Sequence, residues 1–217
     1  MGASQLTVAV ARRSLEKTMA QRGTSYVQEV QGIVDATYRV IARTGSFDPK
    51  LRDILSESGL STQAFYKHFR SKDELMLVLL DDGRRRLLGY LAHLMEKVDR
   101  PEDKIRAWIE GVLAQAQDAE VAARTRPFVA YQDRLAEQFP DEQQRSVDLL
   151  IGLLSEAIAH LRGARSKVSI GRDAKAIYEL SFSTLHRHLS HGTHPSHAEV
   201  NHVVQFSLRG VGALPAP

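Results

Sequence analysis

The sequence predicts an all-α protein of about nine helices. Apolar residues recur every three or four positions along most of the 217 residues, which is the spacing of one face of an α-helix. No segment alternates apolar and polar residues for long enough to predict a β-strand. Aromatic residues make up only 6% of the chain, whereas leucine and alanine, both strong helix formers, are common. These three observations favour helix throughout.

The chain divides into three parts. Residues 1–23 form a basic arm with four basic residues against one acidic residue, and this excess equals the net charge of +3 of the whole chain. Such an arm either contacts an anionic polymer or is a solvated tail. Residues 24–71 contain short predicted helices, and residues 72–217 contain longer ones. We therefore expect a domain boundary near residue 71.

Each short helix has its own start and stop signals. A capping box at Ser25 starts the first helix. Asp48 followed by Pro49 has the pattern of an N-cap and a first helical residue, and predicts the start of the second helix. Gly59 is suited to end that helix, because glycine readily adopts the left-handed conformation found there. Ser61 then caps the third helix.

The longer helices are predicted from serine caps, from prolines at first turns and from apolar spacing. Pro127 and Pro140 are expected to divide the middle of the C-terminal region, because proline disrupts a helix interior. The other expected elements are a helix from a capping box at Ser71 to about Val98, a helix from Pro101, a helix over 143–162, a loop over 163–171, and helices over 172–190 and 197–210.

Residues 54–72, ILSESGLSTQAFYKHFRSK, predict two short helices joined by a tight turn. A short turn containing glycine sets two helices at a steep angle, which is the helix-turn-helix motif. The second helix of such a pair fits the major groove of DNA. The alternative interpretation is an ordinary helix pair whose outer face is merely polar.

The side chains of the second helix suit contact with a nucleic acid. Some can both donate and accept hydrogen bonds, and so can meet base edges or phosphate oxygens, namely Ser61, Thr62, Gln63 and Tyr66. Others can neutralise phosphates, namely Lys67, Arg70 and Lys72. Phe65 and Phe69 are four residues apart, so we expect both to point inward and hold the helix in place.

The stretch from Ser25 to Leu75 resembles the N-terminal domain of the TetR (tetracycline-repressor-like) family of bacterial transcription regulators. The run FYKHFRSKDEL carries the resemblance most specifically, because family members usually show an aromatic residue, a basic or polar residue, His-Phe, then Ser-Lys and an acid. Beyond this stretch only length and helical spacing match. The resemblance implies a helix-turn-helix domain followed by a helical ligand-binding and dimerisation domain.

The resemblance also implies roles for single residues. The start of the recognition helix corresponds to Ser61 and the three residues after it, while Tyr66 and His68 match positions that usually meet phosphates. Lys72 matches a lysine that contacts phosphate at the start of the fourth helix. Where the family usually has threonine, this chain has Pro49-Lys50, and Lys50 can supply a charge instead. The expected DNA-binding residues are Lys50, Ser61, Thr62, Gln63, Tyr66, Lys67, His68 and Lys72.

For the C-terminal domain, the resemblance implies an effector pocket among helices four to eight. The candidate lining residues are large side chains that would equally suit a core, namely Met95, Trp108, Phe128, Tyr131, Leu154 and Tyr178. Few charges fall on the faces expected to point inward, which favours a small, largely apolar effector. The last two helices are expected to form a homodimer on a palindromic operator in double-stranded DNA, and a repressor released by its effector is the expected function.

A histidine cluster raises an alternative. Six of the nine histidines lie close together, namely His186, His188, His191, His194, His197 and His202. Histidine ligates metals, so a metal-sensing regulator is the alternative function. Their spacing matches no established zinc pattern, and the favoured interpretation is a polar turn at the edge of the dimer, with no metal.

The sequence lacks the motifs of several other classes of protein. The chain has no cysteine, no glycine-rich phosphate-binding loop and no GxSxG elbow, so we expect neither an enzyme nor a cofactor. No stretch approaches the ~20 apolar residues of a membrane span, and the first residues do not form a secretory signal. A cytoplasmic protein is therefore expected. A helical interaction protein without DNA binding is a further alternative.

Overall fold

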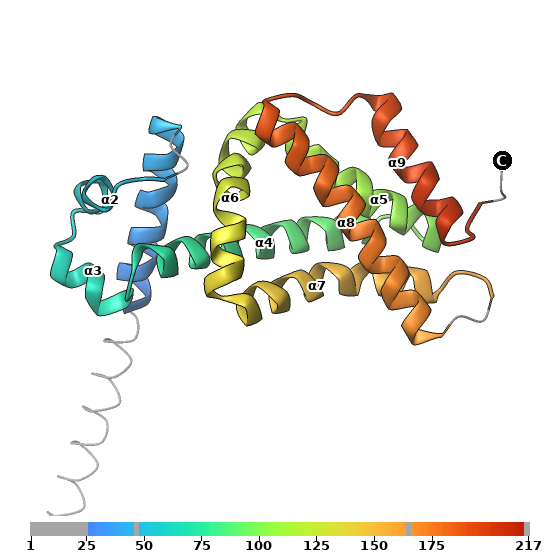
Figure 1. The fold of residues 1–217 in the computed structure, drawn as a ribbon, viewed down its shortest axis with the longest axis horizontal. Helices are drawn as coiled ribbons and strands as arrows, with labels where there is room; N and C mark the ends of the chain where they lie inside the picture. The colour runs from blue at the N-terminus through green and yellow to red at the C-terminus, as the bar shows by residue number, and fades with distance from the viewer. Residues whose placement is uncertain (1–25, 46–47, 164–165, 215–217) are drawn as a thin grey trace, which may run out of the picture. The chain divides into compact units, whose positions relative to one another are not determined.

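The computed structural model describes residues 26–45, 48–163 and 166–214, and within α6 it leaves out a few side chains, among them those of Phe128 and Tyr131. The predicted arm over 1–23 and the cap at Ser25 lie outside this range. All secondary structure of the described residues is helical, which confirms the all-α prediction (Figure 1). The elements are a helix over 26–44, α2 (Leu51–Ser58), α3 (Thr62–His68), α4 (Lys72–Glu96), α5 (Pro101–Leu113), the 3₁₀ turn η1 (Ala114–Ala116), α6 (Ala119–Gln138), α7 (Pro140–Ala159), α8 (Lys167–His191) and α9 (His197–Gly210).

The chain forms two compact units, and the division between them falls inside α4, after Leu75. The N-terminal unit contains the helix over 26–44 together with α2 and α3. Its core consists of fully or almost fully buried apolar side chains from each helix, including Ile33, Val40, Ile54, Phe65 and Phe69. Burying such side chains is the main term that holds so small a unit together.

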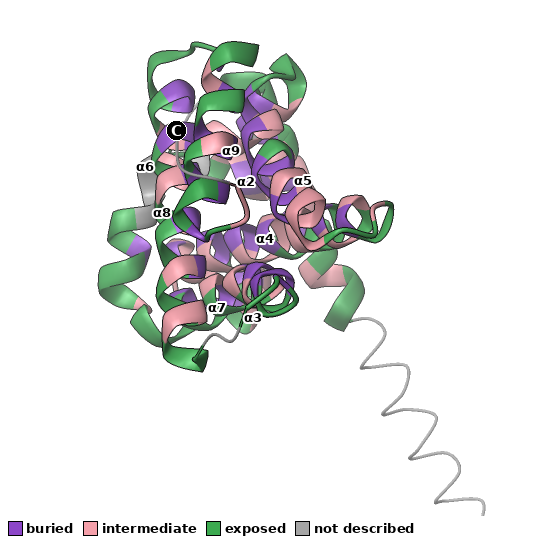
Figure 2. Cartoon of the chain, turned by 90° about the vertical axis from the view of Figure 1, so that its right-hand side faces the viewer, coloured by how far each residue is buried: buried purple, intermediate pink, exposed green. Residues whose placement is uncertain are grey.

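The C-terminal unit is built around α5. This helix begins with Pro101 in its first turn, followed by acidic Glu102 and Asp103, which suit the positive end of the helix dipole. The helix packs against α7, α8 and α9 through a completely buried apolar stripe, formed by Ile105, Trp108, Ile109, Val112 and Leu113. Figure 2 shows buried positions on the faces that helices turn toward one another and exposed positions on the outer faces.

One glycine lets α5 approach α4 closely. A Cβ atom at Gly111 would lie 2.6 Å from Leu91 Cδ2 and 2.9 Å from Leu94 Cδ1. Both distances are shorter than van der Waals contact, so a side chain at this position would push the two leucines out of place.

The predicted start of α2 is wrong by two residues. The helix begins at Leu51, and Lys50 before it is extended, with φ −72° and ψ 137° and no side-chain cap. Pro49 is buried. Pro49, expected as the first helical residue, therefore lies two positions before the first residue of α2.

Two further boundaries of the prediction are wrong. Helix α6 continues through Pro127, although an internal proline removes one backbone hydrogen bond. Buried residues on both sides of it, Ala122 and Leu135, hold the helix in the core. Helix α8 begins at Lys167, inside the predicted loop over 163–171, because the Ser166 side chain accepts a hydrogen bond from the Ser169 amide at 3.1 Å.

Candidate nucleic-acid interface

The turn between α2 and α3 follows the two predicted signals. Gly59 ends α2 in the left-handed conformation, with φ 69° and ψ 15°. The Ser61 side chain accepts a hydrogen bond from the Ala64 amide at 3.1 Å and so caps α3. Three residues therefore separate the two helices, which confirms the predicted helix-turn-helix.

Two phenylalanines hold α3 in the N-terminal unit. Phe65 and Phe69 are both buried, and their rings stack with centroids 5.3 Å apart. Because one face of α3 is fixed in this way, the opposite face is presented outward. It carries Thr62 and Gln63, both exposed, and Tyr66, which is 56% exposed.

Glu29 links the C-terminal end of α3 to the first helix. Its Oε2 atom lies 2.6 Å from His68 Nε2 and 3.2 Å from Lys67 Nζ. The His68 side chain is 0% exposed, and its ring packs edge-on against that of Tyr26 at a centroid distance of 4.7 Å. The phosphate contact expected of His68 is therefore not open to its imidazole in this conformation. His68 instead positions α3.

Glu57 makes a corresponding link from α2. Its carboxylate accepts hydrogen bonds from Arg39 Nε at 2.8 Å and from Arg43 Nη1 at 2.5 Å. These two hydrogen bonds lower the pKa of Glu57 below its usual value. The partners are 18 and 14 residues away along the chain, and no sequence pattern connects them.

The basic residues at the starts of helices differ in exposure. Lys50 is exposed immediately before α2, and Lys72 is half-buried at the first position of α4. Arg52, which the sequence prediction passed over, is 80% exposed in its side chain and lies 3.2 Å from Asp53. Its positive charge and its position two residues after Lys50 are the sequence signals that indicate a further phosphate contact.

The residues predicted to line one effector pocket are not all brought together. Trp108 and Leu154 are completely buried in the core of the C-terminal unit. Met95 lines a cavity of about 490 Å³ between the α4–α5 connection and α7, whereas Tyr178 lines a different cavity. The side chains of Phe128 and Tyr131 lie outside the described part.

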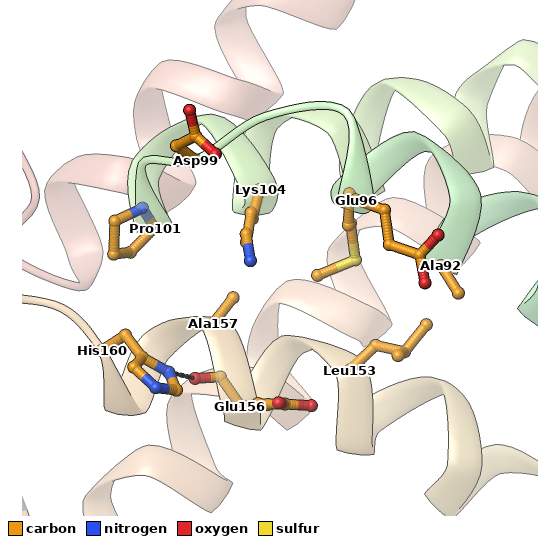
Figure 3. Close-up of a pocket in the computed structure, with 10 residues that line it drawn as sticks. Ala92, Glu96, Asp99, Pro101, Lys104, Leu153, Glu156, Ala157 and His160 are labelled. Atoms are coloured by element: carbon orange, nitrogen blue, oxygen red, sulfur yellow. Dashed lines mark hydrogen bonds between the residues drawn. The ribbon is translucent and has the colours of Figure 1, made fainter.

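The cavity that Met95 lines has charged walls (Figure 3). Lys104 from α5 extends into it, with the carboxylates of Glu96 and Glu156 nearby. His160 at its edge bonds through Nδ1 to the backbone oxygen of Glu156 at 2.8 Å. This mixed lining does not match the apolar pocket that the sequence led us to expect.

An aromatic cluster and a buried cation occupy the middle of the same unit. The rings of Tyr178 and Phe182 stack with centroids 4.4 Å apart, and both lie near Trp108. Arg84 from α4 is buried and donates to Gln143 on α7. The expectation that few charges point inward missed this arginine, because apolar spacing along α4 does not show that Arg84 faces other helices.

His186 is expected to make the C-terminal unit less stable in acid. Burial lowers the pKa of His186, the nearby charge of Arg84 lowers it further, and Asp133 opposes both. A histidine whose folded pKa is depressed costs stability as pH falls below its unfolded value of about 6.5. We expect wild-type protein to lose more thermal stability between pH 7 and pH 5 than His186→Gln, measured by circular dichroism. Parallel losses in the two proteins would contradict this role.

The other histidines of the cluster make separate hydrogen bonds. His188 contacts Thr193 Oγ1 at 2.8 Å and Glu199 Oε2 at 2.9 Å, which links α8 to α9. His191 bonds to the backbone oxygen of Arg187, and His194 to that of Ala116. Within the described ranges, no three histidine, aspartate or glutamate side chains converge as a metal site would require.

Comparisons with known proteins agree with this architecture. Residues 33–79 match the family model of bacterial regulatory proteins of the tetR family. No curated protein sequence matches the chain. Among solved structures, a transcriptional regulator from Rhodococcus sp. Rha1 is similar with a TM-score of 0.62 and 18% identity, covering 86% of this chain and 99% of that one.

Two further solved structures share the fold. The fatty acid degradation regulator FadR from Bacillus halodurans is 17% identical, with a TM-score of 0.61 over 85% of this chain and 99% of its own. The transcriptional regulator FadR from Bacillus subtilis, in complex with stearoyl-CoA, is 16% identical, with a TM-score of 0.58 over 83% of this chain and 98% of its own. Such low identities establish a shared fold and leave the ligand open.

None of the helices in the described ranges is both long and apolar enough to span a lipid bilayer. The helix-turn-helix lies in the region that matches the family model, and the C-terminal helices have the fold of the similar regulators. The N-terminal part of the chain therefore matches the tetR family of bacterial regulatory proteins, and the chain shares the fold of the similar transcription regulators.

Proposed function

We propose that the chain is a transcription regulator of the TetR family, a repressor that binds a palindromic operator as a homodimer and leaves it when a small effector binds the C-terminal unit. The observation that carries the DNA contact is the outward face of α3, where Thr62, Gln63 and Tyr66 are exposed on a helix held by Phe65 and Phe69. This is the arrangement in which a recognition helix reads the major groove.

The residues of the interface divide by role in this proposal. Thr62 and Gln63, in the first turn of α3, contact base edges, while Tyr66, Lys50 and Lys72 contact phosphates. The Ser61 hydroxyl already caps α3, so it contributes to DNA contact by donating its proton to a phosphate oxygen. Lys67 and His68 act through Glu29 to hold the end of α3.

The proposed dimer forms through α8 and α9. Phe206 on α9 is 63% exposed, which is unusual for so large an apolar side chain. It lines a largely apolar cavity of about 180 Å³, together with Ala176, Ile177, Leu180, Gly210 and Val211. Asp173 and Ser207 are the polar residues of this lining. A second copy of the same surface, related by two-fold symmetry, would cover these residues.

The proposed effector has an apolar part and is held inside the C-terminal unit. The aromatic cluster of Trp108, Tyr178 and Phe182 supplies apolar surface. The same unit contains buried polar atoms without a hydrogen-bond partner, Trp108 Nε1 and Ser181 Oγ among them. The similar regulator from Bacillus subtilis, whose structure contains stearoyl-CoA, makes an amphipathic effector a reasonable class for this chain. The effector acts by binding more tightly to the conformation that does not fit the operator.

Operator selection followed by base substitution tests this proposal. Genomic fragments retained by the protein are sequenced, and the shared site is placed in a binding assay. We expect Gln63→Ala to cost about 1–3 kcal/mol at the matched site and to relax preference at one base position. We expect Lys50→Ala to weaken binding to all sequences alike and to reduce the salt dependence.

Equal losses on all sequences for both variants would contradict the division between base and phosphate contacts. Retention of no fragment above background would contradict DNA binding itself.

A further inference from the structure

Arg84 is a buried charge for which the described residues provide no ion-pair partner. Its side chain projects from α4 into the C-terminal unit and the residue is 9% exposed. Burial lowers the pKa of Arg84, but a guanidinium stays protonated at any physiological pH. Burying such a charge is costly unless an anion or several acceptors compensate it.

Two acidic residues near Arg84 are engaged with other arginines. Asp81 is close enough to raise the pKa of Arg84, yet its carboxylate forms an ion pair with Arg85. Glu142 lies 3.2 Å from Arg145. Among the residues that the structure describes, no carboxylate forms an ion pair with Arg84. Its hydrogen-bond acceptor there is the neutral amide of Gln143, at 2.6 Å.

That hydrogen bond leaves a second donor unsatisfied. Arginine can only donate, so the Gln143 oxygen must face the guanidinium and the amide nitrogen must point away from it. Gln143 is 6% exposed, and its Nε2 atom is buried with no hydrogen-bond partner. An unpaired buried donor is costly, so a ligand that accepts a hydrogen bond from Gln143 Nε2 would recover part of that cost.

Both donors line a cavity that suits an anion. The cavity measures about 270 Å³, and its described lining is Arg84, Ala136, Pro140, Gln143, Gln144, Val147 and Tyr178. No acidic residue belongs to that lining. Burial raises the pKa of Tyr178, so its phenol stays protonated near neutral pH and can donate as well. Residues that carry a guanidinium, an unpaired amide and a phenol thus line one space.

A neighbouring cavity offers room for an apolar group. It measures about 290 Å³ and shares Arg84 and Gln143 with the first. Three apolar side chains, Leu77, Val78 and Leu149, contribute to its wall. The lining is completed by Asp81, Glu142, Arg145 and Ser146. A molecule with an acidic head and a short apolar tail could therefore place its head beside Arg84 and Gln143 in the first cavity and its tail in the second.

We propose that the Arg84–Gln143 pair binds the anionic head of a small amphipathic acid, either a carboxylate or a phosphate monoester. This inference rests on the proposed effector response, for which it names the chemical class of the ligand. The head accepts hydrogen bonds from Arg84 and Gln143 Nε2, and the tail lies along the apolar wall. The ligand thus supplies the counter-charge that the described chain does not.

The test measures binding to the full chain without DNA, by titration calorimetry and by thermal unfolding. The probes share one tail and differ in the head: octanoate, octyl phosphate and the neutral octanol. We expect octanoate or octyl phosphate to bind and raise the unfolding temperature, and octanol to bind at least tenfold more weakly. The tighter of the two anions identifies the head group.

Two substitutions locate the binding to this pair. Arg84→Met removes the charge, and we expect it to weaken anion binding about tenfold to a hundredfold, as loss of a charged hydrogen bond does. Gln143→Glu places a carboxylate where the amide oxygen now meets Arg84. We expect this variant to be more stable than wild type and to lose anion binding. It keeps the test informative if Arg84→Met unfolds.

Lys104 provides the matched control, because its positive charge lies in a different cavity. Lys104 lines the separate cavity of Figure 3, so Lys104→Met should bind octanoate as wild type does. The proposal is overturned if octanol binds as tightly as the anions, if no anion binds, or if Gln143→Glu binds octanoate unchanged. An anion that binds but does not release the operator would retain this site and refute the proposed effector response.

Discussion

Replacing Phe65 with alanine is expected to unfold the N-terminal unit and to abolish DNA binding. Phe65 is completely buried where α3 meets the rest of that unit. Removing a buried phenylalanine side chain costs about 3–5 kcal/mol, because the lost contacts leave a cavity. A unit this small has little stability in reserve, so the loss approaches its whole free energy of unfolding.

Hydrogen exchange measures this effect locally. We expect amides of the helix over 26–44, α2 and α3 to lose protection in Phe65→Ala while α5 and α8 keep theirs. Tyr66→Ala is the matched control, because it removes the adjacent aromatic ring from the exposed face. That variant should stay folded and bind DNA more weakly. Protected amides in Phe65→Ala, with normal operator affinity, would show that Phe65 does not hold α3.

The second large effect is expected at α9. In the proposed dimer Phe206 is covered by the partner, and Phe206→Glu would bury a charge in an apolar interface. Aromatic residues at the centre of an interface contribute at least about 2 kcal/mol each, and an unpaired buried charge adds a further penalty. We expect sedimentation equilibrium to show a monomer at micromolar concentration, and operator affinity to fall at least a hundredfold.

Val168→Glu is the control for this experiment. Val168 lies on α8 and has the same exposed fraction as Phe206, 63%, but it does not line the apolar cavity between α8 and α9. We expect this variant to remain dimeric. If Phe206→Glu also remains dimeric and binds the operator normally, the dimer must use another surface.

Local signals in the sequence determined the helix-turn-helix. Gly59 and Ser61 each act within a few residues of the chain, one through its freedom to adopt positive φ and the other through a hydrogen bond to Ala64. The spacing of Phe65 and Phe69 predicted that they share one face, and both are buried. The all-helical class and the family resemblance rest on patterns of the same short range.

Contacts between distant residues were decided only by the tertiary structure. The ion pairs of Glu57 with Arg39 and Arg43, and the burial of His68 against Glu29 and Tyr26, join separate helices. Continuation of α6 through Pro127 likewise depends on packing, which outweighs a local preference. Arg84 and Gln143 are 59 residues apart, and each looks like a surface residue in its own stretch of sequence. Only the packing of the C-terminal helices removes both from water, and that burial turns two ordinary polar residues into a candidate site for an anion.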